Sequence, residues 1–107
     1  SEPEPALVPV AAPVIATPPP AANVAAAIKS AQEKVSAGNV DEALKDYESV
    51  VRANDGLDIV IKDLQKLTND DKQKKNPAVY RTLGDALMRN GDLQDALDTY
   101  RRALNLL

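Results

Sequence analysis

Near its C-terminus the chain reads NPAVYRTLGDAL over residues 76–87 and GDLQDALDTYRRAL over residues 91–104. In both segments apolar residues recur at spacings of three and four, which is the spacing of one face of an α-helix. Asn76 before Pro77 is a helix-start signal, because Asn caps free N–H groups and Pro suits the first helical position. Gly91 separates the segments and permits a tight reversal. The stretch therefore predicts two antiparallel helices joined by a short turn.

An earlier segment repeats part of this pattern. Residues 38–47 read GNVDEALKDY, which parallels GDLQDALDTY at residues 91–100, and the equivalent alanines lie 53 residues apart. This order of residues resembles the tetratricopeptide repeat, a helix–turn–helix unit of about 34 residues. The remaining residues match a short additional helix and a charged loop. The resemblance thus implies two repeats with a helix inserted between them.

The resemblance differs in strength along the chain. It is strongest over residues 76–107, good over residues 38–51 and weaker over residues 24–37, where Lys34 occupies a position that the family gives to a large apolar residue. A shift of one residue would place Val35 there instead. Both registers remain open at this point.

Small residues are expected where the two helices of the C-terminal pair cross closely. Gly84 and Ala96 fit those positions, since they let two backbones approach. The rest of the space between the helices would be filled by four further residues, namely Leu83, Leu87, Tyr100 and Ala103.

The periodicity and the flanking residues predict five helices and no strand, hence an all-α fold of antiparallel helix pairs. The expected helices cover residues 24–37, 39–52, 57–67, 77–90 and 92–107. They divide the domain into a first repeat-like unit (24–53), an inserted helix (57–67) and a second repeat (77–107). Asn39 could cap the second helix, with Glu42 completing a capping box. Gly56 is expected to be the left-handed residue that ends it.

Residues 1–23 have a different composition, because seven of the eight prolines fall in the first twenty residues. Proline fixes its own φ and favours extended geometry in its predecessor. We predict an extended or disordered linker, and favour a passive spacer over a ligand for a Pro-binding module. Pro9 and Pro13 are separated by three residues, which does not fit the Pro-x-x-Pro pattern. Because the chain begins at Ser1, we expect it to be a fragment or a processed form of a longer protein.

The composition argues against several classes of function. There is no Cys and no His, so the commonest general base, metal ligand and thiol nucleophile are absent. A net charge of −3 with interspersed signs and only 3 % aromatic residues argues against nucleic acid and anionic membranes. We expect no catalytic residues, no cofactor and no metal site. The lack of Cys favours the cytoplasm.

In the family that the sequence resembles, the first helix of each unit lines a groove that holds a peptide or a helix of a partner. The resemblance therefore implies an interaction module, a scaffold or adaptor. The residues that would face the groove are Ile28, Gln32, Ala78, Arg81, Asp85, Met88 and Arg89. A clamp for acidic C-terminal peptides is not expected, because Asp85 stands where a neutral or basic residue is needed.

A plainer interpretation of the charged residues remains open. Arg81 with Asp85, and Asp85 with Arg89, could form exposed i,i+4 ion pairs worth about 0.3–0.5 kcal/mol each. They would then serve the helix and no partner.

The last helix suggests an alternative function. Stacked repeats bury their apolar faces against neighbours, and this helix would leave an apolar face open, formed by Leu97, Leu104, Leu106 and Leu107. The alternative is therefore a structural domain that self-associates. We expect mutation to separate the two functions, with Arg81 and Asp85 serving a partner and Leu104 serving self-association.

Overall fold

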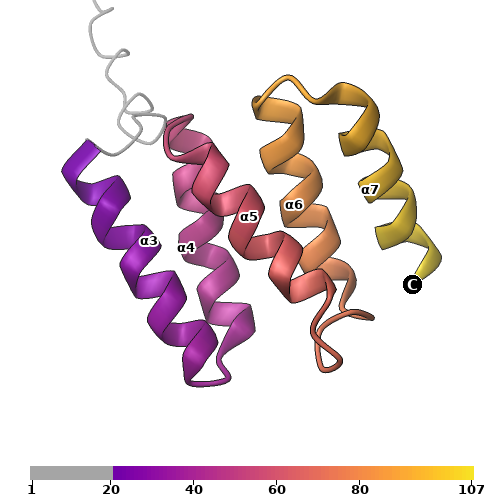
Figure 1. Cartoon of the computed structure of the whole chain (residues 1–107), viewed down its shortest axis with the longest axis horizontal. Helices are drawn as coiled ribbons and strands as arrows, with labels where there is room; N and C mark the ends of the chain where they lie inside the picture. Colours follow the sequence, from indigo (N-terminus) through magenta and orange to yellow (C-terminus); the bar gives the residue numbers. More distant parts are fainter. Residues whose placement is uncertain (1–20) are drawn as a thin grey trace, which may run out of the picture.

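The computed structural model describes residues 21–107, which form five helices and no strand (Figure 1). In chain order they are α3 (Ala21–Ser36), α4 (Val40–Ala53), α5 (Leu57–Thr68), α6 (Pro77–Arg89) and α7 (Leu93–Asn105). The predicted all-α class is confirmed. Helix α3 begins three residues before the expected start, so residues 21–23 are helical. The linker predicted for the preceding residues lies outside the described part of the chain.

Two of the helix pairs, α3–α4 and α6–α7, share one turn geometry. Gly38 and Gly91 both have a left-handed backbone, with φ of 84° and 86°. The amide of the following residue, Asn39 or Asp92, donates to the carbonyl five residues earlier at 2.8 Å and 2.9 Å. Both turns are therefore the same glycine-ended helix cap. A constant offset of 53 residues relates the two pairs without a gap.

This offset decides the register of the first pair. It makes Lys34 the counterpart of Leu87 and Ala31 the counterpart of Gly84. Ala31 is fully buried, as a small residue at a helix crossing should be. Val35 is only partly buried and packs against the core. The register with Lys34 at the apolar position is therefore the correct one.

The two small positions of the C-terminal pair lie where the helices meet. Ala96 is fully buried. A methyl group added at Gly84 would lie 2.6 Å from the ring of Tyr100. The aromatic ring thus lies directly on the backbone of α6, and glycine is needed there.

Helix α5 covers the crevice between α3 and α4. The backbone just before α5 lies close to α3, because a Cβ atom added at Gly56 would lie 3.0 Å from Cδ1 of Ile28. About two turns further along α5, Asp63 accepts hydrogen bonds from Gln32 at 2.9 Å and from the hydroxyl of Tyr47 at 2.8 Å. Helix α6 then lies against both α4 and α5, and α7 lies against α6 (Figure 1).

The helix boundaries agree only in part with the sequence signals. At the start of α6, Oδ1 of Asn76 accepts from the amide of Ala78 at 3.1 Å, and Pro77 occupies the first turn, as predicted. Helix α4 is capped at Asn54, which is left-handed with φ of 57°. Gly56 is left-handed as predicted, with φ of 68°, but it precedes α5, and the left-handed residue that caps α4 is Asn54 instead.

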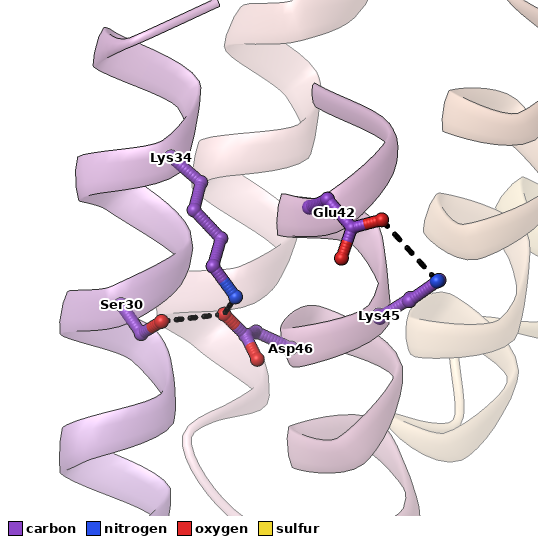
Figure 2. Close-up of polar contacts among 5 residues, drawn as sticks. All are labelled: Ser30, Lys34, Glu42, Lys45 and Asp46. Carbon is purple, nitrogen blue, oxygen red and sulfur yellow. Dashed lines mark hydrogen bonds and ion pairs between the residues drawn. The ribbon is translucent and has the colours of Figure 1, made fainter. Parts of the chain in front are cut away.

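The predicted capping box at Asn39 does not form. The Asn39 side chain makes no capping hydrogen bond. Glu42 pairs instead with Lys45 at 3.3 Å, three residues along the same helix (Figure 2). An exposed acid with a neighbouring lysine has an alternative partner, and the motif alone does not reveal that competition.

The outer face of the α3–α4 pair is polar. Asp46 accepts from the hydroxyl of Ser30 at 2.7 Å and from the ammonium of Lys34 at 2.9 Å (Figure 2). Burial alone would raise the pKa of Asp46, but the hydrogen bonds from Lys34 and Ser30 outweigh it and hold that pKa below its usual value. The counterparts in the second pair are Leu83, Leu87 and Thr99, all buried. We call Ser30, Lys34 and Asp46 the polar end.

Candidate functional site

The crevice between α6 and α7, the counterpart of the one that α5 fills, is open. One section has a volume of about 450 Å³ and is lined mainly by charged residues, among them Arg81, Asp85 and Arg89. A second section of about 600 Å³ is mostly apolar, with Ala78 and Leu104 in its wall. Arg81 and Tyr100 line both sections. We therefore treat them as one surface, the α6–α7 groove.

The helix spacing of α6 builds the charged section. Arg81, Asp85 and Arg89 lie four residues apart, so they share one helix face. Met88 lies on the same face. Helix α4 supplies the opposite wall, where Glu48 pairs with Arg81 at 3.3 Å. The groove therefore carries cations and anions in alternation.

The ion pairs expected within α6 do not form. Arg81 reaches across to α4, and Asp85 accepts a short hydrogen bond from the hydroxyl of Tyr100. Burial, together with the hydrogen bond to Asp85 and its negative charge, raises the pKa of Tyr100 to about 12. These contacts join α4, α6 and α7, so the charged residues serve the tertiary structure as well as the surface.

The apolar section exposes large side chains of α7. Leu104 is 66 % exposed and Leu107 is 88 % exposed. The counterpart of Leu104 in the first pair is Val51, which is only 5 % exposed and packs in the core. Leu97 and Leu93 are also exposed on α7, but neither lines the groove. Leu106, the cap residue of α7, is half-buried.

The two candidates from the first unit do not join this site. Ile28 is buried in the core beneath Gly56, so it offers little accessible surface. Gln32 is exposed, but its amide donates to Asp63 of α5. The structure thus brings together only the five candidates on α6.

Sequence reasoning missed two features of the groove. It assigned Tyr100 to packing between helices, whereas this residue also lines both sections. It also treated Arg81 and Leu104 as parts of separate surfaces, and they line the same apolar section. The two residues are therefore neighbours in one section, and the expected separation of the two functions by mutating them stays a prediction. The spacing of α7 carried no signal for this, because it depends on how α7 crosses α6.

The paired helices, the glycine turns and the buried small residues agree with a comparison against family models. The model described as tetratricopeptide repeat matches residues 28–106. The chain belongs to the tetratricopeptide repeat family. No curated protein and no solved structure matches it significantly. Tetratricopeptide repeats generally mediate protein–protein interactions and typically carry no enzymatic activity, so a protein-binding role follows at this level.

Other kinds of site find no support in the part of the chain that the structure describes. Within residues 21–107 there is no group of three or more side chains that could hold a metal ion. In the same range no helix is long and apolar enough to span a membrane.

Proposed function

We propose that the chain is an adaptor whose α6–α7 groove binds a helical segment of a partner protein. The partner contributes apolar side chains to the section near Leu104 and polar side chains to the section near Asp85. No catalytic step is involved, since binding is the whole activity.

One observation carries this proposal, namely that the chain already contains an example of the complex. Helix α5 lies in the crevice of the first pair, with its start against Ile28 and its Asp63 against Gln32 and Tyr47. The three contacted residues are Ile28, Gln32 and Tyr47. Their counterparts 53 residues later line the open groove and are Arg81, Asp85 and Tyr100. A crevice of this shape therefore accepts an amphipathic helix, in the manner of other helix-in-groove complexes.

A displayed library of random peptides selected on the chain tests the proposal. We expect enriched peptides to have helical apolar periodicity and to lose at least about tenfold in affinity for Leu104→Lys, which places a charge in the apolar section. Leu97→Lys is the matched control, because Leu97 is exposed on the same helix but lies outside the groove. Selected peptides that bind Leu104→Lys as tightly as the wild type would contradict the proposal, and so would a library without binders.

The exposed leucines of α7 also support self-association as a second candidate function. Leu97 and Leu104 are 46 % and 66 % exposed, and their counterparts Leu44 and Val51 are buried. A head-to-tail array would place the α7 leucines against the charged polar end of the next copy. Two copies related by a twofold axis, with α7 against α7, avoid that mismatch.

Sedimentation equilibrium distinguishes this candidate from the first. If α7 pairs with itself, both Leu97→Lys and Leu104→Lys should convert a dimer into a monomer. A wild-type chain that remains a monomer at high concentration would exclude self-association. In that case the groove proposal would stand.

A further inference from the structure

The first helix pair and its occupant suggest what chemistry the open groove selects, an inference that rests on the proposed function. In the first pair the occupant α5 presents an acidic residue, Asp63, to two hydrogen-bond donors, Gln32 and Tyr47. Both donors are directed to the same carboxylate oxygen, Oδ2. An acid on the docked helix is therefore favoured in that crevice.

The open groove has the opposite preference at the equivalent position. The counterpart of Gln32 is Asp85, an acceptor in place of a donor. The counterpart of Tyr47 is Tyr100, whose hydroxyl proton is already used in the hydrogen bond to Asp85. If a docked helix placed an acidic side chain at the position equivalent to Asp63, that side chain would meet the carboxylate of Asp85. No hydrogen-bond donor would be available to it from Tyr100. Such like-charge contacts oppose binding, whereas a basic side chain would be attracted.

The residues one turn away on either side are basic. Arg81 replaces Ile28, and Arg89 replaces Ser36. Arg81 is directed toward Glu48 of α4, but its side chain stays 61 % exposed. Its guanidinium can therefore donate to a further partner. Arg89 is exposed, and within residues 21–107 it makes no ion pair. The face of α6 therefore presents positive, negative and positive charge at intervals of one helical turn.

We propose that the α6–α7 groove selects an amphipathic helix with the complementary order of charges: an acidic, a basic and an acidic side chain, spaced one turn apart. The basic side chain contacts Asp85, and the two acidic ones contact Arg81 and Arg89. The same arrangement discriminates against a helix with the charges of α5. A second copy of the chain therefore does not insert its own α5 sequence into the groove.

The test uses two peptides held helical by a staple on the solvent face. The first has the sequence of α5, Leu57–Thr68. The second carries Ile59→Glu, Asp63→Lys and Lys66→Glu, which places acid, base and acid on one helix face. Each is titrated into the wild-type chain, with amide chemical shifts near Tyr100 reporting occupancy and those of the polar end serving as an internal reference.

We expect the substituted peptide to bind the wild-type chain at least about tenfold more tightly than the α5 peptide. Asp85→Gln, which restores the residue type of the first pair, should reduce that preference, because it removes the partner of the basic side chain and leaves Arg81 and Arg89 for the acidic ones. The variant should still fold, since a glutamine carbonyl can accept from Tyr100. Asp98→Gln is the matched control, because it removes the same charge from the exposed surface of α7 and should leave the preference unchanged.

The possible outcomes separate the two proposals. Equal affinity of both peptides for the wild-type chain would refute the charge preference while leaving helix binding in place. Failure of both peptides to perturb the groove would refute the proposed function as well. A dimer at the same concentrations, with a second copy in the groove, would make that copy the occupant and overturn the proposal.

Discussion

The α3–α4 and α6–α7 pairs have the same internal construction and different surroundings. In both, a small residue on the first helix, a buried alanine on the second and a tyrosine one turn later close the pair. The two pairs differ in the side chains that meet, or lack, neighbouring helices. Lys34 faces solvent where its counterpart Leu87 is buried, and Leu104 is exposed where its counterpart Val51 is buried.

This comparison shows that place in the stack, rather than the hairpin itself, determines the burial of the outer residues. The first pair has no described helix against Lys34 and Asp46, and there the chain uses an ion pair. The second pair receives α5 on that side, so its equivalent positions are apolar or neutral. On the opposite side of each pair the burial is reversed. Helix α5 covers the crevice of the α3–α4 pair, whereas the equivalent crevice of the α6–α7 pair is open. The uncovered apolar residues of α7 are therefore the basis of the docking surface proposed above.

The largest expected difference between the pairs is the response to a charge at equivalent positions. Val51→Lys buries an ammonium group and should lower the free energy of unfolding by about 3 kcal/mol or more. Leu104→Lys should change it by less than about 0.5 kcal/mol, because Leu104 is exposed in the free chain. Urea unfolding of both variants measures this. A similar cost for both would mean that α7 is already covered in solution.

The next effect concerns the helix crossings. Gly84→Ala forces a methyl group against the ring of Tyr100 and should cost about 1–3 kcal/mol. The reciprocal change, Ala31→Gly, should cost about 1 kcal/mol through lost helix propensity. The midpoints of urea unfolding at constant m-value report both costs. A stabilising Gly84→Ala would show that the tyrosine ring can move aside without loss.

A smaller difference is expected for the two tyrosine hydroxyls. Tyr47 is almost fully buried, and its hydroxyl supports the carboxylate that joins α5 to the first pair. Tyr47→Phe should cost about 1–2 kcal/mol, and Tyr100→Phe about 1 kcal/mol or less, because Tyr100 is half-buried. Thermal unfolding of both variants under one buffer condition measures the order. Equal costs would indicate that α5 is not held through Asp63.

The sequence was sufficient for the hairpins but not for the contacts between them. Local signals such as Pro77 and Gly91 fixed helices and turns, because capping and positive φ depend on near neighbours. The site depended on which helix fills which crevice. Ile28 and Arg81 occupy equivalent helix positions, yet α5 covers only Ile28. The capping box at Asn39 failed for the related reason that Glu42 had a competing partner.

The smallest expected effect is an alkaline titration that separates the two tyrosines. The pKa of Tyr100 is raised to about 12 by burial and by Asp85, above the ordinary value of 10.0. A raised folded pKa contributes stability that is fully present below the unfolded pKa and is lost as pH rises through the folded one. The melting temperature should therefore fall between about pH 10 and pH 12, and Tyr100→Phe should reduce that fall.

The pKa of Tyr47 is also raised, first by burial and then by its hydrogen bond to Asp63, so part of the fall should persist in Tyr100→Phe. Asp85→Asn provides the sharper control, because it removes the negative charge from Tyr100 and leaves Asp63 in place. In the Asp85→Asn variant the phenolate absorbance of one tyrosine, Tyr100, should appear at lower pH than in the wild type. If Asp85→Asn leaves the absorbance curve unchanged, Asp85 does not hold the Tyr100 proton. The open groove would then still have a free donor at the position where the first pair uses Tyr47.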